Sequence, residues 1–281
     1  MSMAADGPRF SRLRVGEEIR RMRIAHNLSQ VQLGTKIGSS GARVSRLETG
    51  ETAPDLAMVM NLLDFFEVSD SEQKRIISLA RLANEHSWWK VSGMQTRQAA
   101  FAELESTAVG ISEYSMVFVP GLLQTPEYAK IRYSDTEGQL PFDMEAALTG
   151  RQERQQILTR SKRPVRYEVI LDELVLHRAT APDNVMVQQR QHLVEMAKQS
   201  NVEVRVLPLG AKIGYHTPSL NSFALYTFAG LPEIGVVETE TTEAQTNDDD
   251  QLERYRHLVK RLRAAALEPD ESIKLIEGGT G

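Results

Sequence analysis

Apolar residues recur at helical spacing through the first 86 residues, where short polar or glycine-containing gaps separate the apolar segments. The gaps hold residues that end or cap helices: Asn27 and Ser29, Gly38 and Ser40, Gly50 with Pro54 and Asp55, and Ser71. The positions expected to face the interior are Leu13, Ile19, Met22, Val31, Leu33, Ile37, Val44, Leu47, Leu56, Val59, Met60 and Leu63. The pattern therefore predicts an all-α segment built from short helices.

From about residue 111 the pattern changes to short β-branched and aromatic runs that alternate with helical stretches. The expected strands are 111–119, 165–171, 202–207, 223–228 and 234–238. The expected helices are 125–132, 143–160, 183–199, 248–266 and 269–276. This alternation predicts a mixed α/β domain.

These patterns divide the 281-residue chain into four parts. We expect a flexible N-terminus at 1–10, an all-α domain at 11–70, a helical junction at 71–110 and a mixed α/β domain at 111–281. Residues 87–110, which include Trp88 and Trp89, show no clear periodicity. The chain is thus expected to be multidomain, with an all-α head followed by a mixed α/β domain.

Composition excludes several kinds of functional site and several cellular locations. The chain has no cysteine, so it has no disulfide, thiolate metal site or cysteine nucleophile. Its apolar runs fall short of the roughly 20 residues that span a bilayer, and the first ten residues lack the apolar core of a signal peptide. We therefore expect a cytoplasmic protein.

Charge is distributed unevenly along the chain, whose net charge is −5. Residues 9–50 carry nine Lys or Arg against three Glu, a local +6, whereas the 231 residues after position 50 hold −10. A basic segment on an acidic chain indicates that only this segment contacts a polyanion. A solvated N-terminal surface would explain the same charges without a partner.

Residues 29–50 have the spacing of two short helices joined by a tight turn. Gly34 supplies the small residue needed where the helices approach closely, and Gly38 permits a left-handed backbone conformation in the turn. The apolar residues expected to hold the pair together are Ile37, Val44 and Leu47. A helix placed in this way fits the major groove of duplex DNA, with its N-terminal residues at base edges.

This motif resembles the helix-turn-helix of phage-repressor and Xre-type regulators over residues 11–70. Its marks are Leu28-Ser29-Gln30 and Val44-Ser45-Arg46-Leu47-Glu48-Thr49-Gly50. The resemblance implies that Gln30 bonds a DNA phosphate. It places the other contact candidates at the start and on the exposed face of the third, recognition helix: Ser40, Gly41, Ala42, Arg43, Ser45 and Arg46.

The chemistry of these residues refines their expected roles. Arg43 and Arg46 lie one turn apart, and arginine is the best donor to O6 and N7 of guanine. Gly41 and Ala42 depart from the usual longer polar residues of the family, so early base contacts are few. Ala42 can still touch a thymine methyl group.

Ser45 and Glu48 each have two interpretations. Ser45 reaches a phosphate or packs against a neighbouring helix, and the sequence favours neither. For Glu48 we favour a structural role over a DNA contact, because a carboxylate that faces phosphates is repelled.

A second resemblance runs from about Trp88 to Ile276. The matching segments are 119–129 (VPGLLQTPEYA), 151–155 (RQERQ), 157–160 (ILTR), 171–173 (LDE), 201–208 (NVEVRVLP) and 253–255 (ERY). Together they resemble the DUF5753 domain that follows such heads in actinobacterial regulators, including WhiJ-like developmental regulators. Members are often encoded beside a small partner protein and are described as antitoxin-like.

The segment at 119–125 has two interpretations of its own. Thr125 can cap a helix that begins at Pro126 and carries Glu127 in its first turn. We favour a scaffold turn, and the alternative is a ligand-binding loop.

We expect a sequence-specific regulator of transcription that binds double-stranded DNA, acts as a repressor by default, and forms a homodimer through its C-terminal domain. That domain is expected to sense a small protein partner or ligand. The alternative is an antitoxin-like protein that acts mainly by sequestering a small partner, with little DNA binding.

An enzyme is the competing class. The candidate groups are Glu168, Asp172, Glu173, His177, Tyr215 and His216, and they form no recognised catalytic constellation. We therefore expect no catalytic activity, no cofactor and no metal site.

Overall fold

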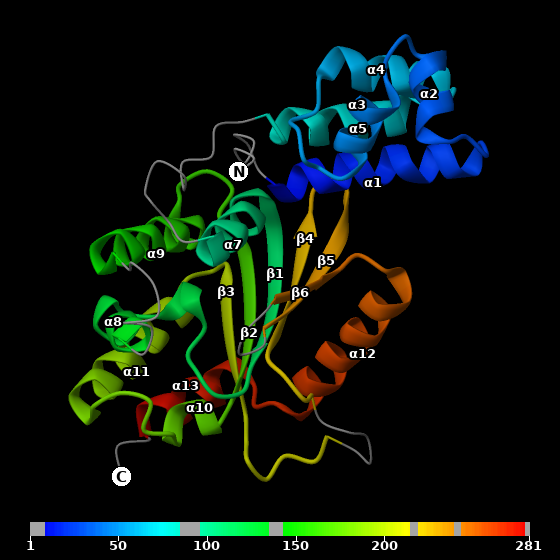
Figure 1. Cartoon of the computed structure of the whole chain (residues 1–281). Coiled ribbons are helices and arrows are strands. Elements are labelled where there is room, and N and C mark those ends of the chain that lie inside the picture. Colours follow the sequence, from blue (N-terminus) through cyan, green and yellow to red (C-terminus); the bar gives the residue numbers. More distant parts are fainter. Residues whose placement is uncertain (1–8, 85–95, 135–142, 214–218, 239–242, 279–281) are drawn as a thin grey trace. The chain divides into compact units, whose positions relative to one another are not determined.

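The structure is a computed structural model that describes residues 9–84, 96–134, 143–213, 219–238 and 243–278 (Figure 1). Trp88 and Trp89 of the junction and the candidate groups Tyr215 and His216 lie outside these ranges. The chain divides into two compact units, residues 1–104 and 105–281. We call them the N-terminal unit and the C-terminal unit and describe each by itself.

The N-terminal unit is built from short helices, as the apolar spacing predicts. Its first helices are α1 Arg9–Ala25, α2 Gln30–Lys36, α3 Gly41–Glu48, α4 Leu56–Phe65 and α5 Asp70–Leu82. Ser29, Ser40 and Asp55 start α2, α3 and α4, because each side chain accepts a backbone N–H from the first turn of its helix. The buried core contains Val15, Ile19, Leu33, Val44, Leu47, Val59, Leu62, Leu63, Phe66, Ile76, Leu79 and Ala80.

Two apolar residues expected in this interior lie at the surface instead. Val31 is 68% exposed and Met60 is 50% exposed. On α4 the core side is formed by Val59, Leu62 and Leu63, and Met60 follows Val59 by about 100° around the helix. The prediction for Met60 was wrong because the unbroken apolar run 56–60 does not show which side of the helix faces the core.

The C-terminal unit contains a six-stranded mixed sheet in the order β3-β2-β1-β4-β5-β6. The strands are β1 Ala108–Ser115, β2 Arg166–Asp172, β3 Val202–Leu207, β4 Phe223–Phe228, β5 Leu231–Glu238 and β6 Glu243–Thr246. β1, β2 and β3 are parallel, and β4, β5 and β6 extend the sheet in antiparallel fashion from β1. Tyr114 of β1 pairs with Ile170 of β2 and with Phe223 of β4. The mixed α/β prediction is confirmed.

Helices cover both faces of this sheet. α7 Thr96–Thr107 leads directly into β1. The helical elements after β1 are the 3-10 turn η1 Gly121–Leu123, α8 Pro126–Ser134, α9 Met144–Thr159, α10 Leu174–His177, α11 Asp183–Ala197, α12 Asp249–Ala265 and α13 Pro269–Gly278. The connections between the parallel strands place α8, α9 and α11 on one side of the sheet, and α12 lies on the other (Figure 1). None of the described helices combines the length and the apolar character that crossing a bilayer requires.

α12, the helix expected at 248–266, is amphipathic. Asp248 caps its start by accepting the Gln251 N–H, and Arg263 lies in its last turn. Its inner side packs on the sheet in a cluster of Tyr114, Ile170, Leu207, Phe223, Leu225, Leu252, Val259 and Leu262. This packing closes one face of the sheet.

The structure departs from the predicted elements at a few places. β1 ends at Ser115 rather than at residue 119, because the Met116 N–H donates to the Ser222 Oγ (3.1 Å) instead of continuing the ladder. The strand β6 and the helix α10 were not predicted, and α7 lies in the region expected as a helical junction, for which no separate helix was given bounds. β6 and α10 are four residues long, too short for a periodic signal.

Candidate nucleic-acid interface

The turn between α2 and α3 brings two helix backbones into contact at two glycines. A Cβ on Gly34 would lie 2.7 Å from the Gly41 nitrogen and from the Ser40 carbonyl carbon, and a Cβ on Gly41 would lie 2.9 Å from the Val31 Cα. Gly38 has φ +67°, in the left-handed region. The predictions for Gly34 and Gly38 are confirmed. The sequence did not reveal that Gly41 packs against α2. The clue was that a glycine stands where the family usually has a longer polar residue.

α3 has one buried and one exposed face. The buried face holds Val44 and Leu47. The side chains exposed to solvent are Ala42, Arg43 and Arg46. Ser45 lies half-buried between the two faces. The exposed face therefore presents one methyl group and two guanidinium groups.

Arg43 is held at both its backbone and its side chain. Its backbone N–H donates to the Ser40 Oγ (3.2 Å), and its Nη2 donates to the Asp55 Oδ2 (2.7 Å). The two charged side chains are 52% and 47% exposed. The guanidinium of Arg46 has no hydrogen-bond or ion-pair partner among the described residues. Of the two arginines of the recognition helix, the side chain of Arg43 is thus fixed by a carboxylate and that of Arg46 is not.

Glu48 lies beneath this surface and joins α1, α2 and α3. Its side chain is 2% exposed, and Arg23 donates to both carboxylate oxygens, from Nε at 2.6 Å and from Nη2 at 2.9 Å. The Gln30 Nε2 donates to the same carboxylate at 2.9 Å. The bond to Glu48 raises the pKa of Arg23 above its usual value. Glu48 therefore has the structural role that its charge predicts.

In the C-terminal unit, α9 holds the turn at 119–125. The Arg151 Nη1 donates to the Gln124 Oε1 (2.7 Å), and the Gln155 Nε2 donates to the carbonyls of Gly121 (2.9 Å) and Gln124 (2.8 Å). A Cβ on Gly121 would lie 2.8 Å from the Arg151 Nη1. The segment at 151–155 thus binds the segment at 119–125.

Gln189 of α11 holds the same turn from a second direction. Its Oε1 accepts the Thr125 N–H (2.8 Å) and its Nε2 donates to the Leu123 carbonyl (2.6 Å), at a side chain with no exposed surface. The Thr125 Oγ1 accepts the Tyr128 N–H (3.2 Å), so Thr125 starts α8 as its position predicts. These contacts are those of a scaffold turn, the favoured interpretation.

Buried ionic groups continue this network toward the sheet. Arg154 of α9 binds Glu105 through two bonds (2.6 and 2.7 Å), and their side chains are 7% and 2% exposed. Burial lowers the pKa of Arg154, but Glu105 outweighs this effect and the net shift is upward. The Tyr167 hydroxyl donates to the Glu113 Oε2 (2.6 Å), and burial together with that carboxylate raises the pKa of Tyr167. These charged side chains therefore hold the domain interior together.

Comparison with protein families assigns both units. A helix-turn-helix model (HTH_3) matches residues 19–73, and the model of a domain of unknown function (DUF5753) matches residues 98–278, more than half of the chain. The chain belongs to the DUF5753 family. Both resemblances are confirmed, and the helix-turn-helix match supports a DNA-binding regulator. No curated protein matches the chain, and no solved structure matches it.

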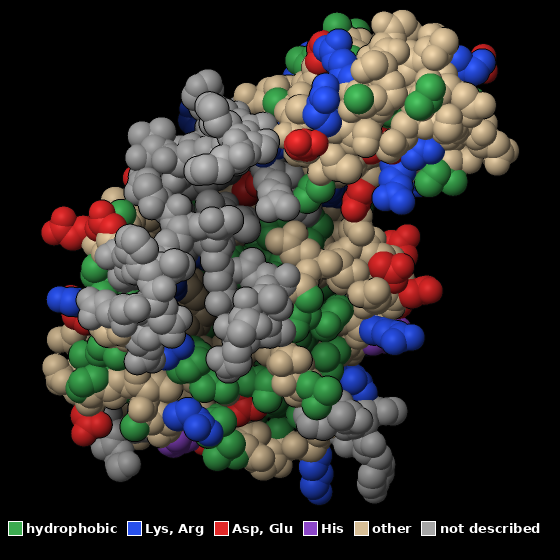
Figure 2. Space-filling view, in the orientation of Figure 1, with side chains coloured by type: hydrophobic (Ala, Val, Ile, Leu, Met, Phe, Trp, Pro, Cys, Tyr) green, Lys and Arg blue, Asp and Glu red, His purple; other side chains and the backbone are tan. Residues whose placement is uncertain are grey.

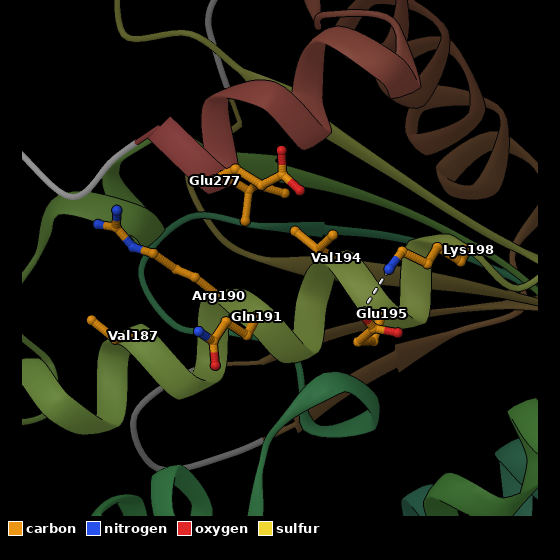
Figure 3. A pocket seen from close by; sticks show the side chains of 8 residues that line it. Val187, Arg190, Gln191, Val194, Glu195, Lys198 and Glu277 are labelled. Atoms are coloured by element: carbon orange, nitrogen blue, oxygen red, sulfur yellow. Dashed lines mark hydrogen bonds and ion pairs between the residues drawn. The ribbon is translucent and has the colours of Figure 1, made fainter.

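The DUF5753 domain has a surface hollow of about 300 Å³ between α11 and α13. Its lining is Val187, Arg190, Gln191, Val194, Glu195, Lys198, Ile276 and Glu277. Figure 3 shows Glu277 across the hollow from the α11 side chains, with Lys198 bonded to Glu195 (2.6 Å). The lining mixes apolar side chains with both charges.

The groups considered for catalysis are engaged in separate pairs within this domain. Glu168 forms an ion pair with Arg263, a residue of α12. Asp172 accepts the Tyr114 hydroxyl (3.1 Å), and burial, with this carboxylate, raises the pKa of Tyr114. Glu173 lies 3.1 Å from the His177 Nε2. In the part of the chain that the structure describes, no group of three or more His, Cys, Asp or Glu is placed to hold a metal ion.

Acidic side chains gather at the start of α12 on the domain surface (Figure 2). The exposed members are Asp248, Asp249, Asp250 and Glu253. Such a surface repels DNA phosphates.

Proposed function

We propose that this protein is a sequence-specific regulator of transcription that binds double-stranded DNA through α3. The observation that carries the proposal is the placement of Arg43 and Arg46. They lie one turn apart on the exposed face of a helix whose other face is in the core. Arginine at such a position donates two hydrogen bonds to guanine in the major groove. The protein acts in the cytoplasm, where it needs no cofactor, metal or catalytic step.

The other predicted contact residues surround this pair. Gln30 uses one of the two N–H groups of its amide on Glu48, which leaves the second for a phosphate. Ala42 faces a thymine methyl group, and Ser45 reaches a phosphate. Ser40 and Gly41 lie at the N-terminal end of α3, the end that meets the base edges. Repression is the expected outcome, since a head bound at a promoter blocks polymerase without a further surface.

The test is a gel shift with DNA fragments from the gene neighbourhood of the protein. Arg43→Ala and Arg46→Ala should each weaken binding to the selected site by about 1–3 kcal/mol. Gln30→Ala should weaken binding to all sequences alike, because phosphates carry no base identity. Arg81→Ala is the control, since Arg81 is an exposed arginine of α5 rather than of the recognition helix. Parent-like binding by both recognition-helix variants would show that α3 does not read the site.

The DUF5753 domain is proposed as the dimerisation and input domain. The support is its size, its acidic surface at α12 and the hollow between α11 and α13, whose volume is at the lower end of the range of ligand sites. Light scattering of the intact protein should give the mass of a dimer. Adding the product of a small adjacent gene should change the affinity of the full-length protein for its DNA site, and an unchanged affinity would argue against an input role for that product.

The same measurements distinguish the antitoxin-like alternative from a DNA-binding regulator. If the protein mainly sequesters a small partner, that partner binds with high affinity while no genomic fragment is selected over unrelated duplex. The exposed Arg43 and Arg46 favour the regulator, because sequestration gives no reason for two arginines on this face.

A further inference from the structure

Asp55 performs two functions with the two oxygens of one carboxylate. Its Oδ1 accepts the backbone N–H of Ala57 (3.0 Å) and of Met58 (3.4 Å), which starts α4. Its Oδ2 accepts the Nη2 of Arg43 (2.7 Å). The residue that begins α4 therefore also fixes the side chain of a residue on the recognition helix.

This ion pair is too exposed to be explained as a major contribution to folding. The Arg43 and Asp55 side chains are 52% and 47% exposed, and pairs of this kind contribute little to stability. A carboxylate beside a DNA-binding surface also repels phosphates. The ion pair thus contributes little to stability, and the charge of Asp55 opposes DNA binding. A role in recognising the DNA sequence would explain why this carboxylate lies here.

The consequence of the contact is a restricted arginine. A free arginine side chain has many rotamers, and it can reach phosphates on any sequence as readily as a guanine. With one N–H held by Asp55, Arg43 keeps its other four side-chain N–H groups for DNA while the position of its guanidinium is limited. The Arg43 side chain is then already ordered in the free protein, so DNA binding loses less of its conformational entropy.

We propose that Asp55 is a specificity-determining residue of the DNA interface, which positions Arg43 to read a base and holds it away from phosphates. The inference rests on the proposed DNA-binding function. Arg46, which lacks such a partner among the described residues, serves for comparison. Asp55 thus increases the preference for the correct site rather than the affinity for DNA in general.

The experiment measures the affinity of the full-length protein for its selected site and for unrelated duplex of the same length. Asp55→Asn keeps a capping oxygen but presents an amide N–H₂ to Arg43, and Asp55→Ser keeps the cap with a side chain too short to reach it. Both variants should lower the ratio of the two affinities by about three- to tenfold, with the loss concentrated at the base pair that Arg43→Ala identifies. Affinity for unrelated duplex should stay the same or rise.

Two controls separate positioning from charge and from folding. Glu51→Gln removes one exposed negative charge from the same loop, and it should change both affinities alike and leave their ratio unchanged. In an Arg43→Ala background, Asp55→Asn should no longer change the ratio. A parent-like ratio in both Asp55 variants, or the same change with and without Arg43, would overturn the inference while leaving the DNA-binding function intact. If the parent protein itself selects no site, the proposed function fails first.

Discussion

At the scale of single residues, Glu48 shows what a sequence reveals and what it omits. Its charge predicted that it would avoid phosphates, and the structure places its side chain inside the N-terminal unit. Its partners Arg23 and Gln30 lie 25 and 18 residues away in the chain. Only the folded chain identifies them, because no local pattern links positions this far apart.

The bond between Arg23 and Glu48 is expected to be important for stability. Arg23→Ala leaves a carboxylate buried without its cation and should lower the free energy of unfolding by about 3–5 kcal/mol. The measurement is chemical unfolding of the full-length protein. Lys198→Ala, which breaks an exposed pair with Glu195, should cost no more than about 1 kcal/mol. An equal loss of unfolding free energy in the two variants would show that burial does not make the bond between Arg23 and Glu48 more important for stability than an exposed pair.

His192 gives a residue-scale prediction about pH. Burial lowers its pKa below the usual 6.5, despite the opposing charge of Glu195. The unfolded chain therefore binds a proton more readily than the folded one, and stability should fall as the pH drops through 6.5, until the folded form also takes the proton. His192→Gln should flatten the dependence of the unfolding midpoint on pH between 7 and 5. The parent profile in the His192→Gln variant would contradict a lowered pKa at this histidine.

At the scale of elements, the turn between α2 and α3 was predictable because a close helix approach and a left-handed backbone both require glycine. The sequence indicated the close approach at Gly34 and the left-handed turn at Gly38, and both are observed. It did not indicate that Gly41 packs against Val31, because a position on a recognition helix is first considered for DNA contact. Packing and recognition compete for the same residue, and the sequence alone does not rank them.

Gly34→Ala should separate these two helices. The added Cβ would lie 2.7 Å from backbone atoms of Ser40 and Gly41, which cannot move without shifting α3. We expect a loss of about 1–3 kcal/mol in stability, together with weaker binding to the selected DNA site. Thermal unfolding and gel shifts measure the two effects. Gly210→Ala is the matched control, because its Cβ meets no described atom within 4 Å. A parent-like Gly34→Ala protein would mean that the helices can adjust.

The turn at 119–125 makes a second prediction at this scale. Gln189→Ala should leave the Thr125 N–H and the Leu123 carbonyl buried without a partner, at a cost of about 1–3 kcal/mol for each group. The measurement is the unfolding midpoint of the full-length protein. Gln191→Ala, two residues along the same helix and exposed, should change it little. Similar effects of the two substitutions would show that the turn does not depend on α11.

At the scale of the whole molecule, the alternation of strands and helices was sufficient to predict the mixed α/β domain. The predicted ranges 202–207 and 223–228 coincide with β3 and β4. The sequence could not supply the strand order, in which β1 lies between β2 and β4, because pairing joins segments more than 50 residues apart. The network of Arg151, Gln155 and Gln189 was equally hidden, although Arg151 and Gln155 lie in one of the family segments.

The dimer is a property of the whole molecule and can be tested through salt. The affinity of a protein for duplex DNA falls with salt in proportion to the number of phosphates it neutralises, with a slope of about −0.9 per phosphate. Two N-terminal units bound to one site neutralise about twice as many phosphates as one. The slope of log affinity against log salt should therefore be about twice as steep for the full-length protein as for a fragment comprising residues 1–104, the compact N-terminal unit. Equal slopes would mean that a single N-terminal unit engages the DNA, and the C-terminal unit would then lose its proposed role in dimerisation.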